Sequence, residues 1–365
     1  MSATRPLLAS LSLCALLLGA CSRHDSEADA PAMPPPLPAE AILPAPPALA
    51  DLRYPTAQDK ITDLSAPGVF QHTGAGRQES GHFGSVRTGA SGLARFHEGI
   101  DIAPLQRDRR GRPLDTVLAV AAGSVGLVNR VAGNSDYGKY VVLVHDDPAG
   151  PVYTLYGHLA DITTGLSEGK TISAGEPVGL MGNTSLSGLP MERAHLHLEI
   201  GLLANQQFLS WPGRKQKTTP GGLYNGQNLL GVDPIEVYRQ RFASTEPFSL
   251  LAHLQSHPVA FELLIRARRQ LVFFETHPAL WTGEYYAGQA MVLSVSEGGL
   301  PLRGRNATPE EIAATGKLSH RVLTVDPARL GRNGRRHVVL SSGSWKLGQN
   351  GQTWLYILTH PGGLH

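Results

Sequence analysis

Short apolar runs separated by glycine-containing turns fill residues 51–244, and they constrain the fold more than any other feature of the sequence. The runs are rich in β-branched residues, and no long helical period appears among them. Many short strands separated by turn signals are typical of antiparallel sheets packed as a stack or sandwich. We therefore predict a mainly β domain, with strands in TVLAVAAGSVGLVNRV, KYVVLVHDD, PVYTLYGHL, KTISAGEPVGLMG and AHLHLEIGLL.

The pattern changes near residue 245. PFSLLAHLQSHPVAFELLIRARRQL has helical apolar spacing, with a break expected near Pro258 because proline interrupts a helix. ATPEEIAATG predicts a short helix in which Thr308 is the N-cap, Pro309 takes the first helical position and Glu311 completes a capping box. The other apolar runs predict strands and hence a smaller α+β domain: LVFFET, AMVLSVSE, HRVLTVD, RHVVLSS and TWLYILTH.

The first 20 residues have the pattern of a secretion signal, in which Arg5 precedes an apolar run too short for a stable membrane span. The run ends in LGAC, which resembles the lipobox of bacterial lipoproteins and implies that Cys21 is lipidated and begins the mature chain. The alternative is an ordinary signal peptide followed by a chance cysteine. Because Ser22 follows, not aspartate, similarity to sorting in enteric bacteria favours the outer membrane. We therefore expect a periplasmic protein anchored to the inner leaflet of that membrane.

The chain is expected to divide into a linker and two domains. Residues 21–50 are rich in Pro and Ala and cannot build a core, so they predict an extended linker. The β domain is expected over residues 51–245 and the α+β domain over residues 246–365. The mature chain would keep one cysteine, so no internal disulfide is expected. A formal net charge of +2, with dispersed basic residues, argues against a nucleic-acid partner.

The stretch ERAHLHLEI contains two histidines within a strand-like run. In a strand, His195, His197 and Glu199 share one face, which is either a polar edge facing solvent or part of a metal site. Upstream, FHEGIDIA places His97 and Asp101 four residues apart, so they share one face of an extended segment. Two imidazoles and a carboxylate suit zinc, and a set of His97, Asp101 and His197 would leave the open fourth position that is typical of catalytic sites.

A single histidine predicts a functional site only when other candidate site residues are expected near it. His158 ends the strand-like run LYGHLA, and alone it would be structural or exposed. Together with the other two segments, it becomes a candidate second imidazole near the attacking water. His253 and His257 also lie four residues apart, but a proline follows and no third ligand is evident. No metal site is therefore predicted there.

Three motifs in this order, HEGID, YGHL and HLHLE, resemble those of the lysostaphin-type (LytM) zinc metalloendopeptidases. The resemblance extends from HFGSVR to DPIEVY and includes VLAVAAGSV and GLMGNT. It implies a groove on a mainly antiparallel β-sheet, in which one Zn²⁺ is bound by His97, Asp101 and His197. It also implies that His158 and His195 are catalytic and face the attacking water and the scissile carbonyl.

The resemblance further implies a peptidoglycan hydrolase, an endopeptidase that cuts peptide bonds in the cross-links between stem peptides of the bacterial cell wall. No HExxH glutamate is present, so His195 is the first choice for the general base. We expect Glu199 either to support the ligands or to face solvent. A Gram-negative wall carries meso-diaminopimelate, which favours a D,D cross-link as the bond that is cut.

Two alternatives stay open. The first is a non-catalytic LytM-like activator of a cell-wall amidase, although such relatives typically lose zinc ligands. The second is an anchored lipoprotein that holds peptidoglycan without cutting it. The α+β domain has no motif, and it could bind peptidoglycan, dock a regulatory protein partner or occlude the groove, which residues 51–80 could also cover. Three segments are longer than is usual in the family and are expected to shape specificity: PLQRDRRGRPLD, SLSGLPMERA and NQQFLSWPGRKQKTTPGGLYNGQNLLG.

Overall fold

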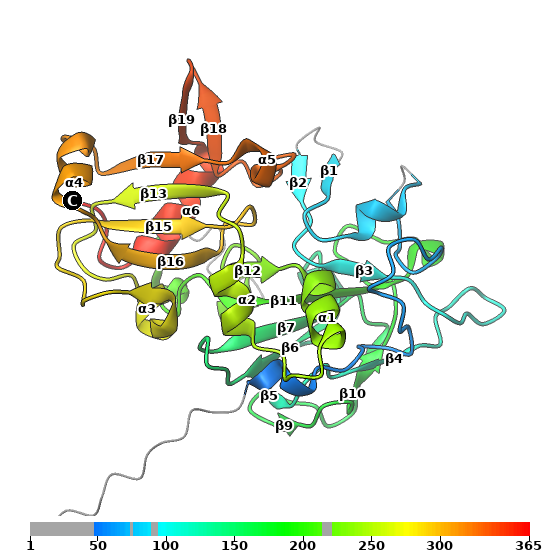
Figure 1. Ribbon diagram of the computed structural model, residues 1–365. Helices are drawn as coiled ribbons and strands as arrows, with labels where there is room; N and C mark the ends of the chain where they lie inside the picture. The colour runs from blue at the N-terminus through cyan, green and yellow to red at the C-terminus, as the bar shows by residue number, and fades with distance from the viewer. Residues whose placement is uncertain (1–46, 74–75, 89–93, 214–220) are drawn as a thin grey trace, which may run out of the picture. The chain divides into compact units, whose positions relative to one another are not determined.

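The computed structural model of the chain describes residues 47–73, 76–88, 94–213 and 221–365, and its elements are drawn in Figure 1. The predicted signal sequence, Cys21 and residues 22–46 of the predicted linker lie outside the described residues. In the described parts of the chain, no helix has the length and apolar character needed to cross a membrane. Residues 44–365 form one compact unit, so the boundary expected near residue 245 stays a prediction.

A seven-stranded antiparallel sheet forms the centre of the region that was predicted to be mainly β. Its order is β12-β11-β7-β6-β5-β9, and β3 and β12 pair with successive halves of the same edge of β11. The sheet confirms the predicted antiparallel architecture. Its strands are β3 (Ile100–Ile102), β5 (Gly123–Asn129), β6 (Tyr140–His145), β7 (Val152–Gly157), β9 (Thr171–Ile172), β11 (Leu196–Leu203) and β12 (Leu229–Val232).

Two strands in the middle of this sheet, β7 and β11, are buried along their whole length. Every residue of β7 and of β11 is buried, so both of their faces are covered by other parts of the chain. The close approach of β3 to β11 depends on Gly99, because a Cβ there would lie 2.3 Å from the carbonyl oxygen of Leu198. A side chain at this position would push the two strands apart.

Smaller elements surround the central sheet. A three-stranded sheet has the order β4-β10-β8, and β1 pairs with β2 in an antiparallel hairpin. These strands are β1 (Val86–Thr88), β2 (Ala94–Phe96), β4 (Thr116–Leu118), β8 (Asp161–Ile162) and β10 (Pro177–Leu180). The 3₁₀ turns are η1 (Ala48–Asp51), η2 (Gln78–Gly81), η3 (Ala132–Asn134), η4 (Met191–Arg193), η5 (Phe208–Ser210), η6 (Gly222–Tyr224) and η7 (Pro278–Leu280).

Two features of this region differ from the sequence-based expectation. Helix α1 (Pro234–Ala243) was not predicted, although its start has a local signal: Asp233 accepts a hydrogen bond from the N–H of Ile235, and proline takes the first helical position. The linker was predicted to reach residue 50, but η1 begins at Ala48 and Leu49 is fully buried in the core. The Pro- and Ala-rich composition around Leu49 gave no indication that this residue would be buried.

The C-terminal region contains a five-stranded sheet of order β14-β16-β15-β13-β17, with β14 parallel to β16 and the other pairs antiparallel. A hairpin of β18 and β19 follows (Figure 1). The strands are β13 (Phe261–Ile265), β14 (Trp281–Thr282), β15 (Met291–Val295), β16 (Pro301–Asn306), β17 (His320–Val325), β18 (Val338–Ser341) and β19 (Ser344–Leu347). The helices are α2 (Leu250–Ser256), α3 (Val272–Thr276), α4 (Pro309–Thr315), α5 (Pro327–Leu330) and α6 (Gln349–Thr359).

The predicted capping box is confirmed. Thr308 accepts a hydrogen bond from the N–H of Glu311, and the Glu311 carboxylate accepts one from the N–H of Thr308. The strands predicted in LVFFET and TWLYILTH are wrong, because these runs form α3 and α6. The helical pattern predicted on the far side of the break near Pro258 is also wrong, because β13 follows there. Short apolar runs are buried equally well as strands or helices, so composition alone could not separate the two.

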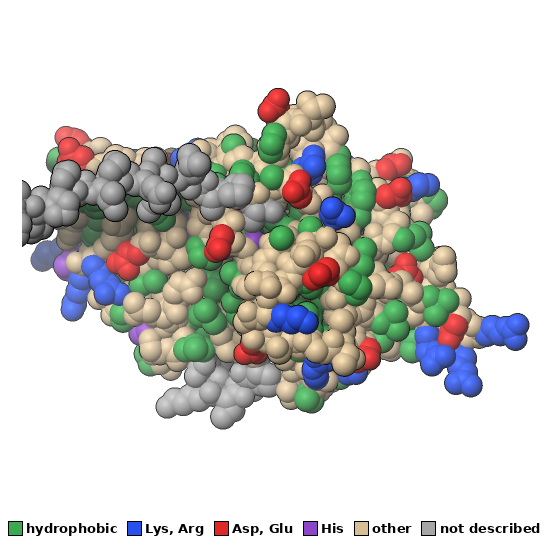
Figure 2. Space-filling model, turned by 90° about the horizontal axis from the view of Figure 1, so that it is seen from below, with side chains coloured by type: hydrophobic (Ala, Val, Ile, Leu, Met, Phe, Trp, Pro, Cys, Tyr) green, Lys and Arg blue, Asp and Glu red, His purple; other side chains and the backbone are tan. Residues whose placement is uncertain are grey.

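One continuous apolar core serves both sheets. Its buried side chains include Tyr156 and Leu198 near the central sheet and Phe261 and Leu358 in the C-terminal region. Figure 2 shows one face of the molecule, on which acidic and basic side chains are interspersed with apolar ones. The two predicted domains therefore share buried surface, whatever the boundary between them.

Candidate metal centre

The three sequence motifs meet where β3, β7 and β11 lie side by side. In the register of the sheet, His197 lies opposite Asp101 on one side and opposite Gly157 on the other. His158 directly follows Gly157, and His195 directly precedes the first residue of β11. Strand pairing thus brings together side chains that are far apart in the sequence.

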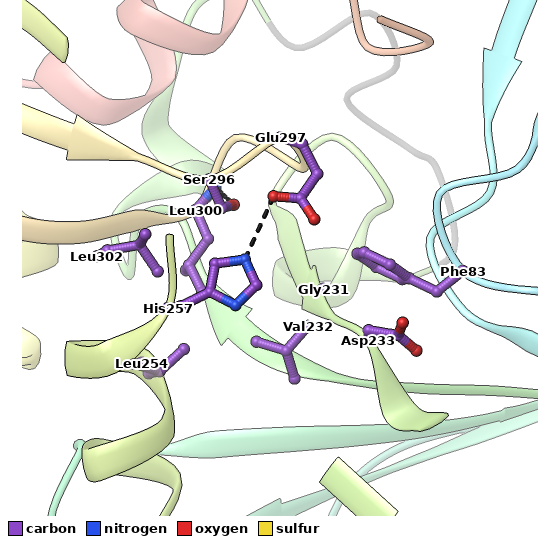
Figure 3. Close-up of a pocket in the computed structure, with 10 residues that line it drawn as sticks. All are labelled: Phe83, Gly231, Val232, Asp233, Leu254, His257, Ser296, Glu297, Leu300 and Leu302. Carbon is purple, nitrogen blue, oxygen red and sulfur yellow. Dashed lines mark hydrogen bonds and ion pairs between the residues drawn. The ribbon is translucent and has the colours of Figure 1, made fainter. Parts of the chain in front are cut away.

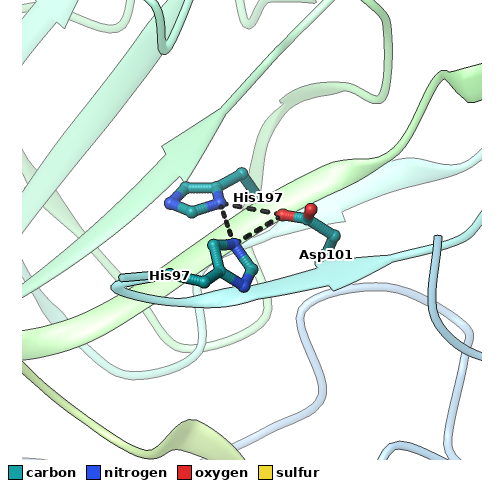
Figure 4. Close-up of side chains that lie close together, drawn as sticks. All are labelled: His97, Asp101 and His197. Atoms are coloured by element: carbon teal, nitrogen blue, oxygen red, sulfur yellow. Dashed lines mark hydrogen bonds and ion pairs between the residues drawn. The ribbon is translucent and has the colours of Figure 1, made fainter. Parts of the chain in front are cut away.

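His97, Asp101 and His197 form a compact buried group, called here the metal triad (Figure 4). The Nε2 atom of His97 lies 3.0 Å from Oδ1 of Asp101, and Nδ1 of His197 lies 2.9 Å from the same oxygen. The two ring nitrogens are 3.2 Å apart. Two imidazoles and one carboxylate converging in this way match the three protein ligands of an open zinc site. The donor set therefore fits one metal ion.

Acceptors behind the two histidines of the triad fix which nitrogen faces the centre. Nδ1 of His97 lies 2.9 Å from the carbonyl oxygen of His82, and Nε2 of His197 lies 2.9 Å from Oε1 of Glu199. A carbonyl or carboxylate oxygen only accepts hydrogen bonds, so Nε2 of His197 is a donor and Nδ1 of His97 can donate to the carbonyl oxygen of His82, although Nη2 of Arg87 also lies 3.1 Å from that nitrogen. Nε2 of His97 and Nδ1 of His197 can then offer their lone pairs to a metal.

Glu199 is fully buried behind the triad. Its carboxylate accepts hydrogen bonds from the hydroxyls of Tyr137 and Tyr153, at 2.8 and 3.0 Å, in addition to the bond from His197. Burial alone would raise the pKa of Glu199, but the hydrogen bond and charge of His197 and the two tyrosines lower it. Of the two roles expected for Glu199, the structure thus shows support of a ligand.

His158 and His195 border the triad in a matching arrangement. Nδ1 of His158 lies 2.8 Å from the carbonyl oxygen of Thr184, and Nδ1 of His195 lies 2.7 Å from that of Arg193. By the same logic both Nδ1 atoms donate to these carbonyl oxygens. Nε2 of His195 lies 3.3 Å from Oδ1 of Asp101, and the rings of His158 and His195 meet edge to face with centroids 4.7 Å apart.

The carboxylate of the triad is held in its ionised form. Burial alone would raise the pKa of Asp101, but His195, His97 and Arg87 together hold it well below its usual value. Burial lowers the pKa of His97 in turn. A charged carboxylate beside a neutral imidazole is the protonation state that a divalent cation requires.

The remaining imidazoles differ in their affinity for protons. Burial, together with His195 and His197, lowers the pKa of His158 to about 3, so this ring is neutral at physiological pH. Burial also disfavours a proton on His197, but hydrogen bonds to Asp101 and Glu199 raise its pKa to about 9. A cation that binds the triad therefore has to displace a proton from His197.

Comparison with known proteins places this region in a family. The model of peptidase family M23 matches residues 95–208, a stretch that contains the triad, His158 and His195. Residues 95–208 belong to peptidase family M23. The relationship to lysostaphin-type peptidases that the three motifs predicted is thereby confirmed. An uncharacterized metalloprotease of Haemophilus influenzae is 35% identical over 133 residues, which make up 35% of this chain and 24% of that protein.

Solved structures of M23-type peptidases are similar over part of the chain. A zinc-containing peptidase from Vibrio cholerae is 25% identical, covers 36% of this chain and 36% of its own, and has a TM-score of 0.26. The catalytic domain of the antimicrobial peptidase lysostaphin from Staphylococcus simulans is 18% identical, covers 43% of this chain and 89% of its own, and has a TM-score of 0.27. Because these TM-scores are low, the assignment rests on the M23 match and the motifs. With the buried triad, they indicate a metallopeptidase domain.

The sequence analysis did not predict a role for Arg87, which binds the carboxylate of the triad. Nη2 of Arg87 donates to Oδ2 of Asp101 at 2.6 Å, which leaves Oδ1 to the imidazoles. Nε and Nη2 of Arg87 also donate to the carbonyl oxygen of Ser80. The signal was present, because Arg87 ends the stretch HFGSVR that belongs to the family resemblance, but its spacing from the ligands gave no reason to assign it a role. Tyr137 and Tyr153 were missed for the same reason.

Two of the expanded segments of the M23 domain are joined next to His195. Arg107, from PLQRDRRGRPLD, donates to the carbonyl oxygens of Met191, Glu192 and Ala194 at 2.9, 3.2 and 3.2 Å. A cavity of about 310 Å³ lies between the two segments, with Pro113, Leu180, Met181 and Met191 among its lining residues. The third expanded segment includes residues 214–220, which lie outside the described residues.

Residues 51–80 include a stretch that runs along β3. Phe70 forms a bridge with Ile102, and the N–H of Gln71 donates to the carbonyl oxygen of Asp101 at 2.9 Å. This stretch therefore supports the backbone of a triad residue.

Proposed function

We propose that this protein is a zinc-dependent endopeptidase that hydrolyses peptide bonds in peptidoglycan cross-links. The observation that carries the proposal is a group of five side chains: the buried metal triad, with His158 and His195 beside it. Each of the four imidazoles has its donor nitrogen occupied by an oxygen acceptor. Three protein ligands leave one coordination position of a zinc ion open, as in catalytic sites. A structural zinc site would fill all four coordination positions with protein ligands.

In the proposed mechanism, His97, Asp101 and His197 hold the zinc ion. Zinc bound there supplies polarisation of the scissile carbonyl and acidification of the attacking water. His195 accepts the proton of that water at Nε2, because its Nδ1 is committed to the carbonyl oxygen of Arg193. The proximity of Asp101 stabilises the imidazolium that results.

His158 has a complementary role in this proposal. Its low pKa keeps the ring neutral, so Nε2 can accept a hydrogen bond from the water or from the leaving amine. The backbone of His158 has a φ of 60°, which is unusual for a residue with a side chain. Backbone strain of this kind is found where a side chain must be aimed at a site.

The substrate and location are proposed from the sequence. Stem peptides of peptidoglycan are the proposed substrate, and a D,D cross-link is the proposed bond. The signal sequence and the lipobox around Cys21 support a periplasmic protein with a lipid anchor in the outer membrane. The C-terminal region could add a contact to peptidoglycan or to a regulatory protein partner.

The test uses soluble protein that begins after Cys21. Purified sacculi are digested with zinc present, and the released fragments are identified by liquid chromatography and mass spectrometry. We expect loss of cross-linked dimers with the wild type and no loss with His97→Ala. The matched control is His72→Ala, which removes an exposed histidine outside the site. Intact dimers after exhaustive digestion by zinc-loaded wild type would overturn the proposal and favour the amidase activator.

A further inference from the structure

A tightly held loop in the C-terminal region reaches the segment that carries a triad residue. The loop is formed by residues 331–337, between α5 and β18. Asn333 and Arg336 have φ values of 48° and 53°, a region that residues with side chains rarely adopt. The Asn350 side chain donates to the carbonyl oxygen of Arg335 at 2.9 Å. Strained backbone with side-chain anchors persists where the surroundings enforce one conformation.

Arg335, a residue of this loop, contacts both sequence neighbours of His97. Its Nη1 donates to Oε1 of Glu98 at 2.9 Å, and its Cζ lies 4.9 Å from the centroid of the Phe96 ring. An arginine over an aromatic face is attracted by the ring quadrupole, in addition to its ion pair. Phe96, His97 and Glu98 are consecutive, so the metal ligand lies between the two contacts.

The backbone around these contacts is closely packed. Gly334 lies against the hairpin, because a Cβ there would come 2.8 Å from Cγ2 of Val86 and 3.4 Å from Cα of Phe96. On its other side, the His97 segment is held by a hydrogen bond from the N–H of His97 to the carbonyl oxygen of Ser85, at 3.0 Å. The segment is therefore fixed between β1 and the loop.

The ion pair is shielded enough for its loss to matter. The side chains of Arg335 and Glu98 are 18% and 30% exposed. Among the described residues, Nε and Nη2 of Arg335 are buried and have no hydrogen-bond partner. A guanidinium in this state depends strongly on the one carboxylate that it contacts, because removing that carboxylate leaves an uncompensated charge.

We propose that Arg335 is a positioning residue for His97, through which the C-terminal region completes the metal site of the M23 domain. Arg335 acts on Phe96 and Glu98, and these set the direction of the imidazole between them. The C-terminal region then contributes to metal binding by orienting the imidazole of His97. The proposal rests on the proposed function for the identity of the metal, but its test reads metal binding directly.

The test measures zinc affinity by competition with a chromophoric chelator, with the whole soluble chain. Partners that orient metal ligands typically change affinity by 10–100-fold, and Arg335 acts one step further away, so we expect Arg335→Ala to weaken zinc binding by about 10-fold. Glu98→Gln should weaken it by a similar factor. The double variant should be no weaker than the weaker single variant, because both changes break the same contact.

The matched control is Arg332→Ala, which removes an exposed arginine from the same loop. It should leave zinc affinity unchanged. Arg335→Lys keeps the charge and should fall between the wild type and Arg335→Ala, and melting of the zinc-free proteins reports whether each variant folds. Equal affinities of Arg335→Ala and Arg332→Ala, or a lowered melting temperature with unchanged affinity, would overturn the proposal. Failure of the proposed function would appear separately, as tight zinc binding without release of wall fragments.

Discussion

Two clusters in this protein combine histidines, a carboxylate and an arginine, and only one of them has the geometry of a metal site. The first is the metal triad with Arg87. The second, called here the ion-pair cluster, lies in the C-terminal region beside a cavity of about 10 Å³ (Figure 3). In the described parts of the chain, the triad is the one group with three ligand atoms suitably close together. The ion-pair cluster consists of His253, His257, Glu297 and Arg329.

The position of the arginine separates the two clusters. In the ion-pair cluster, Nη2 of Arg329 lies 3.0 Å from Nε2 of His257 and 3.2 Å from Oε1 of Glu297, so the guanidinium occupies the place where a cation would bind. In the triad, Arg87 binds the outer oxygen of Asp101 and leaves the inner one to the imidazoles. One arginine neutralises its cluster, whereas the other supports a carboxylate that still faces the imidazoles.

The second difference lies in what orients the rings. Both triad histidines have an oxygen acceptor behind the nitrogen that points away from the centre. In the ion-pair cluster, His253 turns Nδ1 to Oε1 of Gln240 at 3.0 Å, and its ring centroid stays 5.7 Å from that of His257. A spacing of four residues across the end of α2 therefore brings the two rings near each other without making their nitrogens converge.

The largest expected effect comes from removing one charge from the triad. Asp101→Asn keeps the size of the side chain but removes the anion that two imidazoles and Arg87 contact. We expect loss of zinc and of wall hydrolysis to background, more than the ~100-fold change typical of partners behind the ligands. Zinc content and release of fragments from sacculi provide the measurement. Glu297→Gln makes the same change in the ion-pair cluster and should alter neither; an equal effect of the two would break the comparison.

The next effect separates binding from catalysis. His195→Ala should retain zinc, because its nitrogen is not part of the triad, and should slow hydrolysis by about 10²–10⁴-fold, as expected for loss of a general base. Zinc content and the initial rate on sacculi are measured on the same preparation. His257→Ala is the control from the ion-pair cluster. If His195→Ala lost its zinc, His195 would be a ligand and the assignment of roles would fail.

The comparison also explains how much the sequence could predict. Alternation along a strand placed His195, His197 and Glu199 on one face, and motif order placed His97 and Asp101 with them, because both arguments depend only on local geometry and chain order. Arg87 could not be assigned, since its contact with Asp101 depends on how a separate hairpin folds back over the ligands. The same limit applies to the fold.

Secondary structure was predicted correctly where specific side chains form hydrogen bonds with the backbone, as in the capping box at Thr308. The prediction failed where hydrophobicity was the only signal. TWLYILTH was predicted as a strand, yet Trp354, Leu355 and Leu358 are buried from one helix, α6. Tertiary burial chose between two conformations that suit the same apolar run.

A smaller effect tests the support behind the triad. Glu199→Gln keeps a side chain of similar size but weakens the acceptor for His197, Tyr137 and Tyr153. We expect zinc affinity to fall by about 10–100-fold, as for other residues that orient a ligand, with chelator competition as the measurement. Glu262→Gln is the control, because that carboxylate also accepts from two hydroxyls but lies in the C-terminal sheet. Unchanged affinity in Glu199→Gln would mean that the sheet alone orients His197.

The smallest expected effect concerns the carboxylates beside the ion-pair cluster. Asp233 lines the same cavity as Glu297, and burial, with added repulsion from Glu236 and Glu297, raises its pKa to about 6 (Figure 3). The native state then holds a proton on Asp233 more tightly than the unfolded state does. Stability is therefore lost as pH rises from about 4 to about 6. Arg329 balances Glu297 but leaves this second anion uncompensated.

Asp233→Asn removes the charge and keeps a good N-cap for α1, since asparagine caps a helix about as well as aspartate. We expect the variant to melt at a higher temperature than the wild type at pH 7, by an amount corresponding to less than about 3 kcal/mol, and to show little advantage at pH 4, where both proteins are uncharged at this position. Zinc-free proteins are used so that the triad does not dominate the transition. If the variant melted above the wild type by the same amount at both pH values, the helix cap and not the charge would account for the difference in stability. The ion-pair cluster would then tolerate a buried anion as well as the triad does.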